Sequence, residues 1–241
     1  MNIDITKPWY SPAYIIHAEA DLVKIYGQAI IDSDTTFQKV GEMKCTAIML
    51  LGLHKVLGQH FFIQACDDQF PDAWTLYQEE VPGKLVDTKY QTVEVVTYEN
   101  HSTIPDSEFI LKHKLINPKK AYDEETVILC YIRKEGTYIY FNLLHKEFKK
   151  HKFKPTRVFI VGNMIKNPQT FTLTQVWPEI HQEDIDYVER TKVYPLPHRI
   201  TFTKGLPRKV NYGGKRIPSK PNIYEPFHLN EAVVKKKYPN K

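Results

Sequence analysis

One stretch of the chain decides the fold, residues 60–99, which read HFFIQACDDQFPDAWTLYQEEVPGKLVDTKYQTVEVVTYE. It opens with an apolar run over residues 60–65 and closes with a run over residues 92–98 that is rich in Val, Thr and Tyr. Both compositions are typical of β-strands. A Val-Pro-Gly sequence at 81–83 lies between them and marks a turn. The stretch therefore predicts a strand followed by a β-hairpin whose outgoing strand covers residues 73–77.

Two carboxylates in this stretch lie where strand pairing can bring them together. Asp72 follows a proline at the start of the hairpin, and Glu94 lies in the middle of the returning strand. An ionisable group inside such a strand is costly to bury unless another group pairs with it. Pairing of the strands can place the two carboxylates side by side, where they either share a proton or hold a divalent cation. We take the cation as the working hypothesis.

Helices are predicted on the N-terminal side of this stretch. Ser11 and Pro12 form a typical helix start, and apolar residues at three- and four-residue spacing continue the pattern over 12–31. A stronger helical pattern covers 35–57 and ends at Gly58. We expect this second helix to pack on the sheet that begins at residue 60.

The C-terminal side predicts a further alternation of strands and helices. The expected elements are a short helix at 108–115, strands at 126–132, 156–161 and 171–176, a helix at 138–150 and an edge element at 184–188. The strands at 126–132 and 156–161 should be parallel, because a helix connects them. The order predicts an α/β fold with a central mixed sheet flanked by helices.

The arrangement resembles the PD-(D/E)xK nuclease superfamily, which has the restriction-endonuclease-like fold, over residues 37–176. The motif residues are Phe70-Pro71-Asp72 directly after an apolar strand, and Glu94 on the next long strand. The resemblance implies hydrolysis of phosphodiester bonds with Mg²⁺ or Mn²⁺, and it makes Asp72 and Glu94 the metal ligands. The backbone carbonyl of Val95 would be a third ligand. Glu42, on the preceding helix, would be an additional site residue, and its neighbour Gly41 would let that helix approach the sheet closely.

The motif departs from the family pattern at one position. The family's lysine should stand two residues after the glutamate, where this chain has Val96. Lys89 or Lys44 could supply the missing positive charge. An alternative register, Asp87-x-Lys89, matches the D-x-K pattern fifteen residues after Asp72. Both registers remain open at this point.

Charge is unevenly distributed along the chain. Residues 190–241 hold 13 Lys or Arg and 2 acidic residues, a net charge of +11, which leaves 20 basic and 26 acidic residues and a net charge of −6 in 1–189. The same C-terminal range contains 7 of the 16 prolines. We predict a nuclease-like α/β domain over 1–189 and an extended, basic, proline-rich arm over 190–241.

Basic side chains on the 138–150 helix, on its continuation and in the arm are the expected nucleic-acid contacts. They are Lys146, Lys149, Lys150, Lys152, Arg208, Lys209, Lys215 and Arg216. Lysines and arginines of this kind neutralise phosphates, and the aromatics interleaved in the arm can stack on unpaired bases. The arm could equally become ordered on a partner protein. DNA is the expected nucleic acid ahead of RNA, and a homodimer or larger complex is compatible with the arm.

Motifs and composition argue against several other functional classes of protein. None of the short motifs of nucleotide-binding loops, serine hydrolases or zinc proteases occurs. The three cysteines lack metal-binding spacing, no apolar run reaches the roughly 18–20 residues of a membrane span, and the N-terminus lacks a signal-peptide pattern. We therefore expect a cytoplasmic, metal-dependent endonuclease of restriction or defence. The alternative is a degenerate nuclease-fold subunit that binds nucleic acid or scaffolds a complex.

Overall fold

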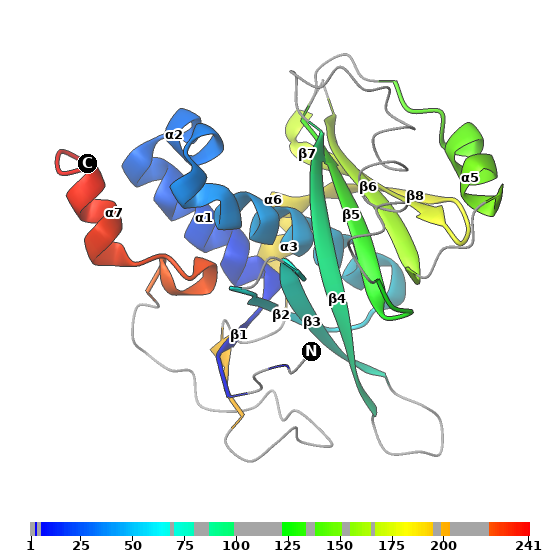
Figure 1. The fold of residues 1–241 in the computed structure, drawn as a ribbon, viewed down its shortest axis with the longest axis horizontal. Helices are drawn as coiled ribbons and strands as arrows, with labels where there is room; N and C mark the ends of the chain where they lie inside the picture. The colour runs from blue at the N-terminus through cyan, green and yellow to red at the C-terminus, as the bar shows by residue number, and fades with distance from the viewer. Residues whose placement is uncertain are drawn as a thin grey trace.

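The computed structural model of the chain describes residues 3, 6–67, 70–79, 87–98, 122–133, 138–150, 155–164, 167–194, 199–202 and 222–241. Within these residues the protein is an α/β fold in which nine strands form one mixed sheet flanked by helices (Figure 1). The strand order is β8-β7-β6-β5-β4-β3-β2-β1-β9. The predicted fold class is confirmed at this level.

The elements have the following bounds. The strands are β1 (Trp9–Tyr10), β2 (Phe61–Ala65), β3 (Ala73–Glu79), β4 (Asp87–Tyr98), β5 (Thr126–Ile132), β6 (Arg157–Met164), β7 (Asn167–Trp177), β8 (His181–Asp186) and β9 (Arg199–Ile200). The helices are α1 (Pro12–Tyr26), α2 (Gln28–Ser33), α3 (Gln38–Leu57), α5 (Phe141–Lys150), α6 (Tyr187–Val193) and α7 (Glu231–Lys237). Two short 3₁₀ helices, η1 (Thr35–Phe37) and η3 (Glu225–Phe227), precede α3 and α7.

The helix ends follow from local chemistry. The Tyr14 backbone N–H donates to Ser11 Oγ at 3.2 Å, and Pro12 occupies the first turn of α1. Gly27, with a φ of 89°, separates α1 from α2. The single helix predicted over 12–31 is therefore wrong at this position, because a positive φ ends the regular helix. α3 ends at Gly58 in the left-handed conformation, as predicted.

The predicted hairpin and crossover are both present. Strands β2, β3 and β4 pair antiparallel, while β4, β5 and β6 pair parallel, with α5 between β5 and β6. β4 begins at Asp87, five residues earlier than the strand predicted from residue 92, because Asp87–Gln91 continue the ladder with β3. The turn predicted to extend to Asp87 is wrong at that residue. The helix predicted at 108–115 lies outside the described residues.

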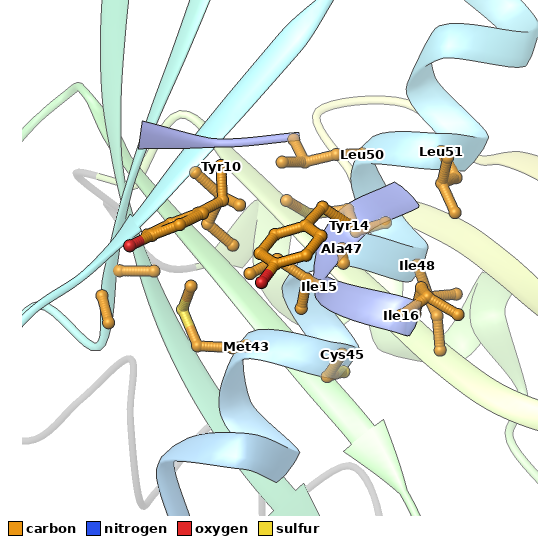
Figure 2. Close-up of a cluster of buried hydrophobic side chains, with 14 of the residues drawn as sticks. Tyr10, Tyr14, Ile15, Ile16, Met43, Cys45, Ala47, Ile48, Leu50 and Leu51 are labelled. Carbon is orange, nitrogen blue, oxygen red and sulfur yellow. The ribbon is translucent and has the colours of Figure 1, made fainter. Parts of the chain in front are cut away.

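Hydrophobic side chains form one core on each face of the sheet. The larger core contains the buried faces of α1 and α3, and Figure 2 shows Tyr14 and Ile15 of α1 beside Met43 and Ala47 of α3. The smaller core lies under α5, where Leu144 and Phe148 pack against alternate residues of β4, β5 and β6. Figure 1 shows α1, α2 and α3 on one side of the β4–β6 strands and α5 on the other. Successive side chains of β4 therefore pack alternately against the α1–α3 layer and against α5.

Close approach of α3 to the sheet occurs at a different glycine from the one expected. A Cβ at Gly52 would lie 2.3 Å from Ile185 Cδ1, so Gly52 is the point of tight helix–sheet contact. A Cβ at Gly41 would meet nothing within 4 Å. The expectation that Gly41 permits close packing is therefore wrong, because a side chain at this position would meet no neighbouring atom.

The described parts of residues 190–241 pack against the rest of the molecule. The predicted boundary after residue 189 falls inside α6, and β9 pairs antiparallel with β1. Side chains buried from this range are Tyr194, Phe202, Tyr224, Phe227 and Val234. Figure 1 places α7 beside α1 and α2. These parts of the range are therefore not an extended arm, because their aromatic and aliphatic side chains enter the larger core.

Two further sequence predictions concern membranes and cysteines. Within the described ranges, no helix combines the length and the apolar content needed to cross a bilayer. Cys45, Cys66 and Cys130 are buried with free thiols.

Candidate functional site

Asp72 is held against both neighbours of Glu94. The Asp72 backbone N–H donates to the Val93 carbonyl at 3.0 Å, and the Val95 backbone N–H donates to Asp72 Oδ2 at 2.7 Å. The β3–β4 register pairs Ala73 with Val93, so Asp72 lies opposite Glu94 at the end of the ladder. The hairpin therefore brings the two predicted carboxylates to adjacent positions. Glu94 is only 1% exposed.

The first turns of α3 add one carboxylate and one ammonium group. Lys39 Nζ lies 2.6 Å from Glu42 Oε2 and 3.8 Å from Asp72 Oδ1, and it donates to the Asp72 backbone carbonyl at 3.3 Å. Lys39 and Glu42 are three residues apart and so share one face of the helix. Gln38 Nε2 donates to Glu42 Oε1 at 2.8 Å, which holds the carboxylate from its other side. Glu42 is thereby brought to the site as expected from the resemblance.

The surroundings of Asp72 raise its pKa to about 6. Burial is the largest cause, and the negative charges of Glu42 and Glu94 add to it. The hydrogen bond from Val95 and the charge of Lys39 act in the opposite direction without cancelling the increase. Asp72 is therefore influenced by two further carboxylates, Glu42 and Glu94, and by one ammonium group, Lys39, so negative groups outnumber positive ones around it.

Tyr122 borders the same carboxylates from the α5 side of the sheet. Its ring belongs to the smaller core and makes an edge contact with Phe70, with ring centroids 5.4 Å apart. Burial raises the pKa of the Tyr122 hydroxyl, and the charges of Glu94 and Asp72 raise it further. Among the described residues, that buried hydroxyl has no hydrogen-bond partner.

The donor set suits a hard cation that keeps water in its shell. Carboxylate oxygens are the ligands that Mg²⁺ prefers, and one or two carboxylates with waters are enough to bind it. Within the described ranges, no group of three or more Asp, Glu, His or Cys side chains is arranged to hold a metal ion. The residues present therefore fit an ion held by a carboxylate pair and water, and not one enclosed by protein side chains.

Three residues that the sequence offered as further candidates lie elsewhere. Lys89 and Asp87 lie opposite Tyr77 and Glu79, five and seven positions before Glu94, or roughly 17 and 23 Å along the strand at about 3.3 Å per residue. Lys44 instead pairs with Glu19 at 2.7 Å. The structure therefore does not bring these three side chains to Asp72.

Sequence reasoning overlooked two residues of this cluster, Lys39 and Tyr122. Lys39 could have been found, because it precedes Glu42 by three residues and so lies on the same helix face. Tyr122 offered no such pattern, because only the tertiary structure brings it to Asp72 and Glu94. Val96, which stands where the family has lysine, is buried in the smaller core.

The predicted nucleic-acid contacts are described only in part. Lys146, Lys149 and Lys150 are exposed on α5, where Lys150 Nζ lies 2.5 Å from Glu147 Oε1. Tyr138 and Tyr140 are exposed just before the helix. The remaining predicted contacts lie outside the described residues: Lys152, Arg208, Lys209, Lys215 and Arg216.

Comparisons with protein-family models, with curated proteins and with solved structures give no match for this chain. A functional assignment must therefore come from the geometry of the cluster formed by Lys39, Glu42, Asp72 and Glu94. We refer to these four residues as the acidic cluster.

Proposed function

We propose that the protein is a Mg²⁺- or Mn²⁺-dependent nuclease that hydrolyses phosphodiester bonds, with DNA as the first substrate. The observation that carries this proposal is the convergence of Glu42, Glu94 and Lys39 on Asp72, which brings together three carboxylates and one ammonium group from α3, from β4 and from the residue before β3. We further propose a restriction-endonuclease-like fold. The succession of α3, the β2–β4 meander, β5, α5 and β6, with β4 to β6 parallel, supports it.

Asp72 and Glu94 are the residues that would hold the cation. The negative charge that raises the Asp72 pKa is the charge that a bound cation would offset. When bound, the metal polarises the phosphate and lowers the pKa of its bound water. The hydrogen bond from Val95 fixes one oxygen of Asp72, so the carboxylate is oriented before any ligand arrives.

Lys39 takes the role of the missing family lysine in this proposal. Its ammonium group lies 3.8 Å from Asp72 Oδ1, whereas Val96 at the family position is apolar and buried. A lysine ammonium is a compact positive charge that can contact a phosphate oxygen. Because Lys39 lies on α3, whereas Asp72 directly precedes β3 and Glu94 lies within β4, the positive charge would approach the phosphate from the helix side.

Nuclease activity on defined substrates tests the proposal directly. The full chain is incubated with Mg²⁺ or Mn²⁺ and with single- and double-stranded DNA and RNA. We expect cleavage that is abolished by chelation, by Asp72→Asn and by Glu94→Gln. Asp184→Asn, an exposed aspartate on β8, is the matched control and should leave the rate unchanged. Failure of the wild type to cut any substrate would contradict the proposal.

A non-catalytic subunit is the second candidate function. One observation favours it: Lys39 already neutralises Glu42 at 2.6 Å, so the cluster has an internal cation. In that case the exposed lysines of α5 would bind nucleic acid, and other faces would bind a second copy or a partner protein. Salt-dependent nucleic-acid binding without cleavage, alone or with a partner, would support this candidate.

A further inference from the structure

Tyr122 occupies a position that the proposed mechanism does not yet use. Its side chain is 6% exposed and is packed on the α5 side, with Phe70 against its ring. Phe70, two residues before Asp72, and Val96, two residues after Glu94, belong to the same core as Tyr122, so its ring lies beside the segments that carry both carboxylates. Lys39 reaches Asp72 from α3, on the other side of the sheet.

Buried tyrosine hydroxyls normally find a hydrogen-bond partner. Others in this protein do: the Tyr26 and Tyr224 hydroxyls bond each other at 2.8 Å, and the Tyr194 hydroxyl donates to the Phe61 carbonyl at 3.0 Å. The Tyr122 hydroxyl has no such partner among the described residues. Its donor is therefore available to a molecule that enters the cluster.

We propose that Tyr122 is a positioning residue whose hydroxyl donates a hydrogen bond to a non-bridging phosphate oxygen of a nucleic acid bound at the acidic cluster. This inference depends on the proposed function, since it names a contact within the same site. A neutral donor suits this role, because an additional anion would repel the phosphate. A tyrosine hydroxyl ordinarily titrates at about pH 10, so it keeps its proton at neutral pH.

The phosphate would then be held between two donors from opposite layers. Lys39 supplies a charge from the α3 layer, and Tyr122 supplies a directed hydrogen bond from the α5 layer. A hydrogen bond to an anionic oxygen is strong and depends on angle, so it fixes the orientation of the group as well as its position. The contact should strengthen as charge develops on the phosphate oxygens in the transition state.

Tyr122→Phe is the decisive variant, because it removes the hydroxyl and keeps the ring that packs on Phe70. We expect kcat to fall about 10- to 100-fold while KM rises only about three- to fivefold, as for loss of a donor whose contact strengthens in the transition state. The melting temperature should not fall, because the lost hydroxyl has no described partner in the free protein. An unchanged kcat overturns the inference, and so does a loss of kcat that accompanies a lower melting temperature.

Tyr90→Phe is the matched control. Tyr90 lies on β4 four positions before Glu94, and its buried hydroxyl also lacks a hydrogen-bond partner within the described ranges. Its pKa is raised by burial alone, without a contribution from the acidic cluster. We expect Tyr90→Phe to cut at the wild-type rate. A loss equal to that of Tyr122→Phe would show that removing any buried hydroxyl is enough, and would overturn the inference.

Binding separates this inference from the proposed function. Anisotropy of a labelled 12-nucleotide single-stranded DNA is measured with Mg²⁺ in the Asp72→Asn background, where cleavage is blocked. Adding Tyr122→Phe should weaken affinity about threefold or more, and adding Tyr90→Phe should not. If the wild type never cuts but this difference is found, the nuclease function fails and the phosphate contact stands. If the wild type cuts and Tyr122→Phe cuts equally well, only the contact fails. If neither cutting nor binding occurs, both fail.

Discussion

Asp34 and Asp72 lie near the same end of α3, yet their surroundings are opposite. Asp34 accepts hydrogen bonds from Lys237 Nζ at 2.8 Å, from the Thr36 backbone N–H at 2.8 Å and from the Tyr238 hydroxyl. These donors hold the pKa of Asp34 well below its usual range. Asp72, by contrast, faces Glu42 and Glu94, and its pKa is raised to about 6.

The difference separates a carboxylate that stabilises the fold from one that does not. The contacts of Asp34 join α7 to η1, and loss of its charge would weaken that junction. The charge of Asp72 is opposed by its neighbours, so folding alone gives no reason to gather these groups. Strongly perturbed carboxyl groups of this second kind occur mostly at functional sites.

The largest difference between Asp34 and Asp72 should be in the cleavage rate after each is replaced by asparagine. Asp72→Asn should lower the rate by about 10³-fold or more, because it removes a ligand that is worth several kcal/mol in the transition state. Asp34→Asn should cut within about twofold of the wild type, because its contacts lie away from the cluster. Single-turnover cleavage assays with saturating Mg²⁺ measure both rates. Equal losses would remove the distinction between the two aspartates.

The contributions of Asp72 and Asp34 to the free energy of unfolding should change with pH in opposite directions. The Asp72 carboxyl has a folded pKa of about 6 against an unfolded value of 3.8, so the folded protein retains that proton between these values. Its contribution to stability is therefore favourable below about pH 4 and is lost as the pH rises through about 6. Without metal at pH 7.5, Asp72→Asn should be more stable than the wild type by on the order of 2 kcal/mol.

Asp34 should behave in the reverse manner. Its folded pKa is depressed, so its contribution is present above about pH 4 and is lost as the pH falls below the unfolded value. Asp34→Asn should therefore be less stable than the wild type at pH 7.5 and should approach it in acid. Urea unfolding in EDTA at pH 7.5, 5.5, 4 and 2.5 measures both variants. Parallel curves for the two would contradict the assignment of opposite pKa shifts.

Lys237→Met tests the hydrogen-bond donor that joins α7 to Asp34. Lys237 Nζ contacts both Asp34 and Thr36, and its loss should lower the unfolding free energy measurably. Lys236→Met, its exposed neighbour on α7, is the control and should change stability by less than about 0.5 kcal/mol. Cleavage should be unaffected in both variants. Chemical denaturation detects the difference.

Gly41→Ala should have the smallest effect on stability. It also tests whether a change in α3 that leaves the acidic cluster intact affects cleavage. A Cβ at Gly41 meets nothing within 4 Å, so alanine should stabilise the helix by up to about 1 kcal/mol. Because Lys39 and Glu42 flank this position, an unchanged cleavage rate would show that the helix start is already well ordered. Gly52→Ala is the contrast on the same helix and should destabilise by about 1–3 kcal/mol, because its Cβ would overlap Ile185.

The parts of the fold that depend on local chemistry could be predicted from the sequence. Ser11 and Gly58 mark helix ends through their own capping groups, and residues 126–132 form a strand with the predicted bounds. The adjacency of Asp72 and Glu94 also followed, because a hairpin has few possible registers. In each case the deciding interactions lie within a few tens of residues.

The features that could not be predicted from the sequence depend on contacts between residues that are far apart in the chain. The prolines of residues 190–241 favoured an extended arm, but Tyr224 and Phe227 are buried against helices from the other end of the chain. Asp87–Gln91 are too polar to predict as strand alone and become one through pairing with β3. Tyr122 likewise meets the acidic cluster only through tertiary structure, so no spacing rule could identify it.

Pairing of β1 with β9 joins Trp9 to Ile200 across the chain. On the ribosome, a bacterial or eukaryotic rate of about 5–20 residues per second separates the synthesis of these two strands by roughly 10–40 seconds. During that interval Trp9 and Tyr10 have β2 as their strand partner but lack β9, so one edge of the nascent sheet stays open. We therefore expect this edge to close only after β9 has left the ribosome, and chains truncated before β9 to expose the edge to aggregation.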